Sequence, residues 1–217
     1  MHECVETKRL ILHRHIFDDG TVLAQMNKKN CCSSPQALSL FLKHNQELIS
    51  GIFGWWLDVA SPYSAGWHIH DDARAWRHKE QLQYYIYEKE TQKCVGIFCA
   101  LIKNNEAYVL AWLSKEGQKK GYASEVALSF EKELFETLGV DKIKYECFNL
   151  NPYKKRVASF LIKMNYQEEI TPNSSTLWIK TRDDYFKIMG VKPLLIKSKK
   201  IGVSFFNRFK NIFVREV

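Results

Sequence analysis

A short stretch of the chain, Gln118-Lys119-Lys120-Gly121-Tyr122-Ala123, carries residue types that suit binding of a phosphate group. Glycine allows a turn to approach a phosphate closely, and the two lysines add positive charge beside it. Downstream, apolar residues recur at helical spacing, at Ala123, Val126, Ala127, Phe130, Leu134 and Leu138. A helix opening here would direct unpaired N–H groups and a positive dipole end at an anion. Taken alone, the pattern equally fits an ordinary basic turn before a helix, so its surroundings must decide.

Three predicted strands precede this stretch. Alternation over 82–86, a nearly continuous apolar run over 94–102 and a third run over 107–113 predict a meander, because 103–106 supplies turn residues between the last two. After the helix, Gly139 stands where a C-terminal cap belongs, and alternation at Ile143, Tyr145 and Cys147 predicts another strand. The glycine stretch therefore lies at a junction of strand and helix.

The remaining elements complete a mixed architecture. Leu10–Leu12 predicts a first strand, apolar spacing over 37–48 predicts a helix, and 51–72 is predicted to be an irregular aromatic loop. Asn151-Pro152 predicts a helix start, and 176–179 predicts a last strand. We expect an α/β (α+β) fold with a single central, mixed and mostly antiparallel sheet flanked by helices.

This order of strand, glycine loop, helix, strand, Asn151 and helix resembles the GNAT superfamily of acyl-CoA-dependent N-acetyltransferases over residues 5 to 180. The superfamily signature is Gln or Arg, two residues, Gly, one residue, and Gly or Ala. The resemblance implies the GNAT fold and acetyl-CoA as cofactor, with Leu113 and Ser114 pairing with pantetheine and Asn151 near the same arm. It assigns the pyrophosphate to Gln118, Lys119, Lys120, Gly121, Tyr122, Ala123 and Ser124. Lys154 either meets a phosphate or is a solvated helix residue.

Segments 6–12, 111–113 and 156–158 are similar to the RimJ/RimL branch, which acetylates protein N-termini such as those of ribosomal proteins. The chain departs from that branch at three points. Tyr108 stands where the branch often has Glu, Lys154 replaces the Ser of Asn-x-x-Ser, and the Leu-Gly-Phe ending reads Met164-Asn165-Tyr166. The missing Glu and Ser leave the catalytic base and acid open.

The resemblance implies direct attack of a neutral amine on the acetyl thioester, without an acetyl-enzyme. The enzyme must align the amine, remove a proton and stabilise the departing thiolate. The candidate bases are Glu106 and Glu146, although each also fits a solvated surface carboxylate. Tyr153 either donates to the thiolate or packs in the core.

The acceptor is predicted from what its amine needs. An α-amine with a pKa of about 8 tolerates a weak base better than a lysine with a pKa of about 10.4. A protein N-terminus is therefore the first prediction. A small amine (a polyamine or an amino sugar) and a CoA-binding, membrane-associated module without catalysis are the alternatives. Trp55, Trp56 and Asp58 match the acceptor side of relatives, where the acid would hold an ammonium, although the tryptophans also suit core packing.

No metal site is expected. His68-x-His70-Asp71-Asp72 lacks the further ligands of a structural zinc site, and Asp71 is predicted to cap a helix before Ala73. The composition, 46% hydrophobic and 26% charged, is that of a globular protein, without a signal peptide or a membrane-spanning run. We expect a cytoplasmic location.

Charge is concentrated at the C-terminal end. Residues 182–217 carry +6 of the net charge of +8, so nucleic-acid binding by the whole protein is not expected. The predicted division is a GNAT domain over 1–181 and a basic extension over 182–217. Apolar residues at helical spacing predict an amphipathic helix over 201–217, which either docks on its own domain or a dimer partner, or binds an anionic membrane.

Overall fold

Eight strands form one sheet in the computed structural model, which describes residues 2–14, 35–50, 61–148, 151–170 and 175–190. The strand order is β1-β2-β3-β4-β5-β6-β8-β7. Each neighbouring pair is antiparallel except β5 and β6, which are parallel. The predicted α/β (α+β) architecture with a mostly antiparallel sheet is confirmed. The strands are β1 Cys4–Glu6, β2 Leu10–Arg14, β3 Gln81–Glu88, β4 Cys94–Lys103, β5 Glu106–Leu113, β6 Lys142–Phe148, β7 Gln167–Ile170 and β8 Ser175–Thr181.

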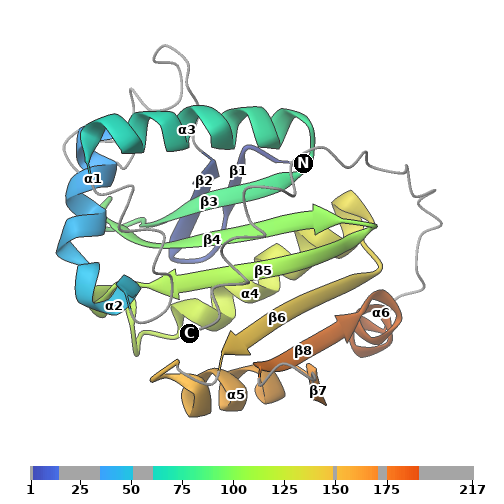
Figure 1. Cartoon of the computed structure of the whole chain (residues 1–217). Helices are drawn as coiled ribbons and strands as arrows, with labels where there is room; N and C mark the ends of the chain where they lie inside the picture. The colour runs from blue at the N-terminus through green and yellow to red at the C-terminus, as the bar shows by residue number, and fades with distance from the viewer. Residues whose placement is uncertain (1, 15–34, 51–60, 149–150, 171–174, 191–217) are drawn as a thin grey trace.

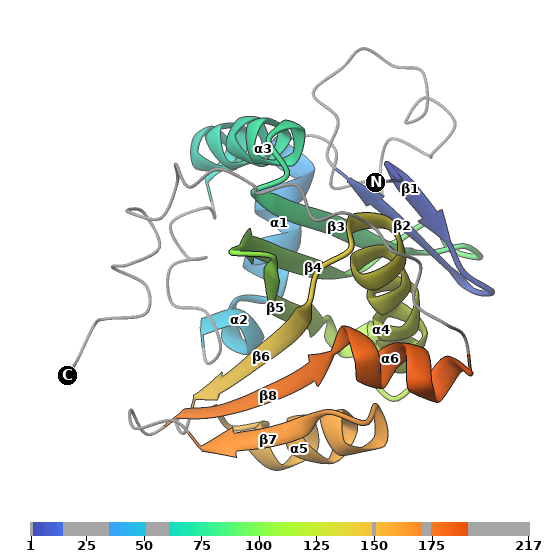
Figure 2. The same cartoon turned by 90° about the vertical axis from the view of Figure 1, so that its right-hand side faces the viewer.

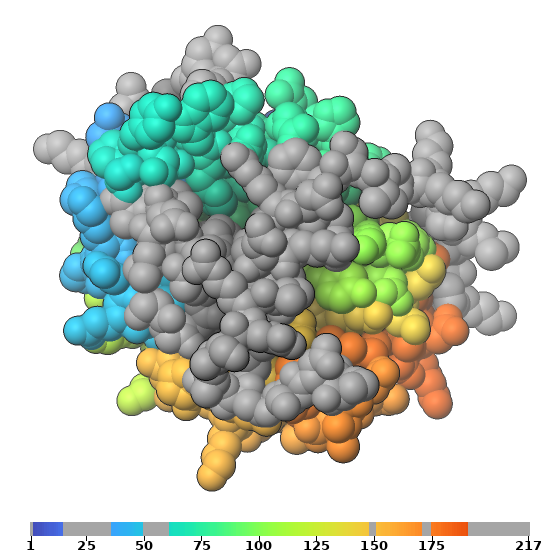
Figure 3. All heavy atoms as spheres, in the orientation of Figure 1, coloured from blue at the N-terminus to red at the C-terminus, as the bar shows by residue number. Residues whose placement is uncertain are grey.

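Helices cover both faces of this sheet (Figures 1 and 2). One face is covered by α1 Pro35–His44, α2 Gln46–Ser50 and α3 Pro62–Arg77. The other carries α4 Tyr122–Lys132, the π-helical turn η3 Glu133–Leu138, α5 Lys154–Lys163 and α6 Arg182–Met189. In the space-filling view, α3 lies at the top of the molecule and α1 at its left side (Figure 3).

Two apolar cores result, one on each side of the sheet. Strand β3 shows the reason, because all of its residues are buried and successive side chains point to opposite faces. Tyr84 packs edge-on against Phe130 of α4, with ring centroids 5.5 Å apart. The neighbouring Tyr85 belongs to the core beneath α1 and α3. A strand buried on both faces reads as a nearly continuous apolar or aromatic run, which is the pattern of β3 and β4.

The turn between β4 and β5 forms as its residues predict. Asn104 and Asn105 both have positive φ, at 51° and 63°. Asparagine tolerates this left-handed conformation, which a two-residue hairpin turn of type I′ requires at both positions. The register follows directly, with Lys103 opposite Glu106 and Gly96 opposite Leu113 at the far end.

Several sequence expectations differ from the structure. The loop predicted over 51–72 is wrong for 62–72, which belong to α3, since Ser61 caps the helix by accepting from the Ser64 N–H at 3.0 Å and Pro62 follows at the first turn. Asp71 consequently lies inside this helix and does not cap one. The helix predicted over 37–48 is divided into α1 and α2, and β1 and β7 were not predicted.

The start of α5 also differs. We predicted the helix to begin at Asn151-Pro152, but it begins at Lys154. The Asn151 Oδ1 accepts from the Tyr153 N–H at 2.8 Å, so its side chain closes a turn before the helix. Pro152 therefore lies in that turn.

The last described helix, α6, packs against the same core as α4. Tyr185 and Phe186 are buried, and Tyr185 stacks on Phe135 with centroids 4.9 Å apart. Helix α6, which ends at the left-handed C-cap Gly190, thus packs on the same core although it lies after the predicted boundary at 181. The division into 1–181 and 182–217 stays a prediction. Residues 51–60 and 191–217, with Trp55, Trp56, Asp58 and the predicted C-terminal helix, lie outside the described residues. Within the described ranges, no helix is long and apolar enough to cross a membrane.

Candidate active site

The parallel strands β5 and β6 are paired over about half of their length and then diverge. They pair from Glu106 opposite Lys142 to Val109 opposite Tyr145, and β5 then continues to Leu113 without β6 beside it. On its other side, β5 stays paired with β4 along its whole length. Backbone groups of the second half of β5 that face β6 are thus left available to a ligand.

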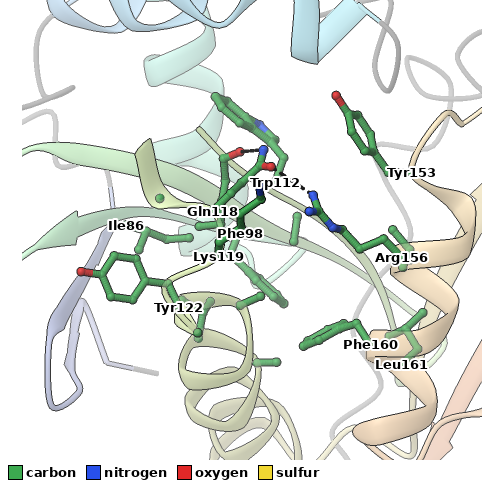
Figure 4. A pocket seen from close by; sticks show the side chains of 18 of the residues that line it. Ile86, Phe98, Trp112, Gln118, Lys119, Tyr122, Tyr153, Arg156, Phe160 and Leu161 are labelled. Atoms are coloured by element: carbon green, nitrogen blue, oxygen red, sulfur yellow. Dashed lines mark hydrogen bonds between the residues drawn. The ribbon is translucent and has the colours of Figure 1, made fainter. Parts of the chain in front are cut away.

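An apolar cavity of about 390 Å³ lies at this divergence (Figure 4). Its walls come from the end of β5, from the glycine loop and α4, from β6 and from the first turns of α5. Aliphatic and aromatic side chains make up most of the lining, and its titratable side chains among the described residues are tyrosines, a lysine and an arginine. The lining contributed by these elements includes Ala111, Trp112, Leu113, Gln118, Lys119, Gly121, Tyr122, Ala123, Val126, Tyr145, Asn151, Tyr153, Arg156, Val157 and Phe160.

The glycine loop presents the start of α4 to one end of the cavity. Gly121 is the N-cap residue, has a φ of +78° and supplies no side-chain cap to the helix. Lys119 is also left-handed, with a φ of 60°. N–H groups in the first turn of a helix have no intrahelical acceptor, and the dipole makes this end positive. The start of α4 therefore has backbone N–H donors where the sequence predicted a phosphate site, and phosphate binding there stays a prediction.

Gln118 ties the loop to both walls of the cavity. Its Nε2 donates to the Leu113 carbonyl at 3.1 Å, and its Oε1 accepts from Arg156 Nη1 at 3.2 Å (Figure 4). Arg156 is exposed and lines the cavity from α5. It brings a cation from α5 to the cavity beside Gln118, and it was not among the predicted site residues. Its place in the first turn of the helix after Asn151 was the available signal.

Ser114 and Lys120, two residues predicted to contact the cofactor, do not line the cavity and instead stabilise the loop. Ser114 is buried, and its Oγ caps the short 3-10 turn η2 Lys115–Gly117 by accepting from the Gly117 N–H at 3.3 Å. Lys120 points to Glu88, with Nζ and Oε1 2.9 Å apart. The Tyr122 hydroxyl donates to the same carboxylate. Hydrogen bonds from Tyr122, Thr91 and Lys120 lower the pKa of Glu88 to about 2.

The other predicted cofactor residues are divided in the same way. Leu113, Gln118, Lys119, Gly121, Tyr122, Ala123 and Asn151 line the cavity. Ser124 and Lys154 are next to lining residues in the chain but are not part of the lining. The structure thus brings most, though not all, of the predicted set together around one cavity.

The predicted carboxylates lie at different distances from the divergence. Glu106 is at the opposite end of β5 from Leu113, and its Oε2 is 2.6 Å from Lys144 Nζ. Glu146 directly follows Tyr145, the last β6 residue paired with β5, and it accepts from Ser175 Oγ at 2.7 Å. Tyr145 lines the cavity, so Glu146 points to the opposite face of the sheet, beneath α1 to α3. Neither carboxylate lines the cavity, although Glu146 is next in the chain to Tyr145, which does, and Glu106 lies at the far end of β5.

Tyr153 was predicted either to donate to the thiolate from the cavity or to pack in the core. It lines the cavity and also packs against the core beneath α1 and α3. Beside it, Trp112 stacks on Phe41 of α1, with centroids 5.3 Å apart. The end of the cavity that faces α1 is therefore aromatic.

No group of three or more His, Cys, Asp or Glu residues is placed to hold a metal within the part of the chain that the structure describes. His68 and Asp72 of the predicted non-metal cluster are instead part of a buried polar network. Asp72 accepts from Gln81 at 2.8 Å and from Gln83 at 2.5 Å. Burial raises the pKa of Asp72 and lowers that of His68 to about 4.

No family model and no curated protein matches the sequence. Solved structures do match the fold. RimL, a ribosomal L7/L12 alpha-N-protein acetyltransferase in complex with coenzyme A, aligns with a TM-score of 0.67 at 15% identity, over 84% of this chain and 99% of that one. The ribosomal-protein-S5-alanine acetyltransferase from Vibrio fischeri aligns with a TM-score of 0.62 at 14% identity, over 84% and 98%.

A third match, FdhC, is described as a nucleotide-linked sugar GNAT and aligns with a TM-score of 0.61 at 20% identity, over 86% of this chain and 96% of that one. Likeness at such identities defines the fold. The chain has the GNAT fold of these acetyltransferases, which confirms the fold that the sequence resemblance implied.

Proposed function

We propose that the protein is an acetyl-CoA-dependent N-acetyltransferase. The observation that carries the proposal is the meeting of a backbone anion site at Gly121 with the half-paired strand β5 at one apolar cavity. A diphosphate ester suits the first feature, because helix N-termini bind phosphate groups. An amide-containing arm suits the second, because it can pair with strand backbone in place of β6.

The residues present fit such a cofactor. Lys119 and Arg156 place cations at two sides of the cavity, and the apolar walls suit a pantetheine arm. When bound, acetyl-CoA supplies the activated acetyl group. The protein's part is to hold the thioester near Trp112 and Leu113, to exclude water with the aromatic walls and to align an amine.

Glu146 is the carboxylate that we assign to proton removal, directly or through a water molecule. It sits one residue beyond the last β5–β6 pair, on the face beneath α1 to α3. Tyr153, in the cavity wall, is the candidate donor to the departing thiolate. Glu106 is bound to Lys144, so we retain it only as the comparison for Glu146.

The acceptor that we propose is a protein N-terminal α-amine. Two of the matching structures are acetyltransferases of ribosomal proteins, and an α-amine needs less help from a base than a lysine side chain. A small amine such as an amino sugar is the alternative, favoured by the likeness to a nucleotide-linked sugar enzyme. The cytoplasmic location remains a prediction from the sequence.

Thiol release from acetyl-CoA, measured with matched acceptors, tests this function. Each peptide is offered with a free N-terminus and with a blocked N-terminus, and the blocked form keeps one internal lysine. Amino sugars and polyamines form the second panel. We expect turnover with free N-termini only. Turnover with amino sugars alone would support the small-amine alternative, whereas CoA binding without turnover on any acceptor would contradict the enzyme assignment.

A further inference from the structure

Arg9, the residue directly before strand β2, reaches the glycine loop with its side chain. The Arg9 Nη1 donates to the Lys120 carbonyl at 2.8 Å, and the guanidinium lies 4.7 Å from the centroid of the Tyr122 ring. Gly121 lies under the same group, since a Cβ added there would be 3.5 Å from Arg9 Nη2. One side chain from a distant part of the chain thus covers three consecutive residues of the loop.

The same arginine engages an acid in the first turn of α4. Arg9 Nη2 is 2.7 Å from Glu125 Oε2, and Arg9 Nε donates to that oxygen at 2.8 Å. The other carboxylate oxygen accepts from the Arg9 N–H at 2.8 Å and from the Thr7 hydroxyl. Both oxygens of Glu125 are therefore held on the β2 side of the helix.

This arrangement matters because of where the acid stands. A carboxylate in the first turn of a helix occupies the position that favours anions, so it competes with a bound phosphate for the positive end of the dipole. The guanidinium neutralises the carboxylate through two N–H donors on one oxygen, and the backbone N–H of Arg9 on the other oxygen helps to fix its direction. The backbone N–H groups of the first turn then remain for the ligand.

Lys120, which the sequence resemblance assigned to the pyrophosphate, pairs with a residue outside the loop. Lys120 pairs with Glu88, whose carboxylate also accepts from Tyr122 and Thr91. The loop is therefore fastened from two segments, by Glu88 of β3 and by Arg9 directly before β2. Only the second fastening also cancels a negative charge at the head of α4.

We infer that Arg9 is a positioning residue for a diphosphate ligand: it holds the loop at Lys120–Tyr122 in the binding conformation and neutralises Glu125 so that α4 can receive the phosphates. The identity of the ligand rests on the function proposed above. The fastening itself does not, because its contacts join residues of the protein to one another.

Arg9→Met tests the inference, with Arg14→Met as the matched control. Arg14 lies at the far end of β2, pairs with Glu3 and sits 5.3 Å from the Trp76 ring, away from the loop. We expect Arg9→Met to raise the KM for acetyl-CoA about 10-fold while kcat changes less than about twofold, since the loop loses its anchor and the Glu125 charge then opposes the phosphates at the start of α4. The kcat/KM for acetyl-pantetheine, which has the thioester but no phosphates, should stay within about twofold of wild type.

Two further variants separate positioning from general destabilisation. Arg9→Met/Glu125→Gln removes the acid that Arg9 neutralises, and it should recover most of the lost acetyl-CoA affinity. Arg9→Lys keeps the charge but cannot reach Glu125 and the Lys120 carbonyl with separate planar donors, so it should lie between wild type and Arg9→Met. Equal losses with acetyl-CoA and acetyl-pantetheine, or no recovery in the double variant, would overturn the inference.

A measurement without ligand keeps this result separate from the proposed function. Hydrogen exchange of the amides at 120–125 should be faster in Arg9→Met than in wild type and unchanged in Arg14→Met. If wild type shows no affinity for CoA, the proposed function fails, while the exchange rates still decide whether Arg9 holds the loop. Unchanged exchange in Arg9→Met would contradict the positioning role regardless of the ligand.

Discussion

Glu88 of β3 anchors the glycine loop through its carboxylate. Three donors, from Tyr122, Thr91 and Lys120, meet on one buried carboxylate. These hydrogen bonds lower its pKa to about 2, below the usual value of 4.5. A carboxyl group with a lowered pKa in the folded protein adds stability above its unfolded pKa, and this contribution is lost as pH falls through 4.5 toward 2.

Glu88→Gln should therefore destabilise the protein near neutral pH. We expect a loss of about 1–3 kcal/mol in the free energy of unfolding at pH 7, because a charged acceptor for three donors is replaced by a neutral amide. Urea titrations at several pH values check this. The difference from wild type should shrink as pH falls from about 5 toward 3, and a constant difference would show that the carboxylate charge is not the cause.

Glu146 and Glu106 allow a direct comparison of two carboxylates on neighbouring strands. If Glu146 removes the proton, Glu146→Gln should lower kcat about 10- to 100-fold at pH 7, and raising the pH should restore part of it as more amine becomes neutral. Glu106→Gln should change kcat less, because its partner is Lys144 at 2.6 Å. Initial rates between pH 6.5 and 9 measure both. A larger loss in Glu106→Gln would reverse the assignment.

For single residues, the sequence does not show in which direction a side chain points, and this limited what could be predicted. The loop was found from residue types, since glycine, lysines and a following helix occur together in the sequence. The pairing of Lys120 with Glu88 joins residues far apart in the chain, and so does the hydrogen bond between Arg156 and Gln118. Neither contact has a local sequence signal, so a basic residue near the loop could not be assigned to the ligand or to the scaffold.

At the scale of elements, a buried ion pair joins β8 to α4 and α5. Lys180 Nζ is 2.8 Å from Glu131 Oε2 and also donates to the Met164 carbonyl at 2.8 Å. The two side chains are only 4% and 2% exposed. The Tyr166 ring lies 5.3 Å from the ammonium. One lysine thus connects three elements behind the wall of the cavity.

Removing one partner should leave the other charge buried. We expect Lys180→Met to cost about 3–5 kcal/mol in the free energy of unfolding, and Lys180→Met/Glu131→Leu to recover much of that loss. Denaturant unfolding measures all three proteins. A cost below about 1 kcal/mol for the single variant would show that Glu131 becomes neutral or reaches water.

Elements with strong periodicity were predicted well. Strands β3 to β6 and helix α4 follow alternation or helical spacing, and the Asn104-Asn105 turn has the conformation its residues favour. Helix α3 was missed because glycine and tryptophans obscured its spacing, whereas tertiary packing of Ile69, Ala75 and Trp76 supports it. The edge strands β1 and β7 are short and exposed, so they have little apolar pattern to read.

At the scale of the whole molecule, the sheet and both cores that the structure describes are built from residues up to Gly190. Truncation after Gly190 should therefore leave a folded protein. If residues 201–217 dock on the domain or on a second copy, the truncated chain should have a lower thermal midpoint or lose a dimer, with unchanged sedimentation on anionic vesicles. Calorimetry, light scattering and vesicle sedimentation of both chains measure this. Vesicle binding by the full chain alone would instead assign the extension to a membrane surface.

The short pairing between β5 and β6 has a mechanical consequence. Four residue pairs carry the continuity of the sheet from β1–β5 to β6–β8. A ligand bound between β5 and β6 contacts both parts of the sheet, which are otherwise joined by these few pairs. Binding should therefore make the junction more rigid, and the ligand-bound protein should be more resistant to proteolysis and to mechanical unfolding than the free protein.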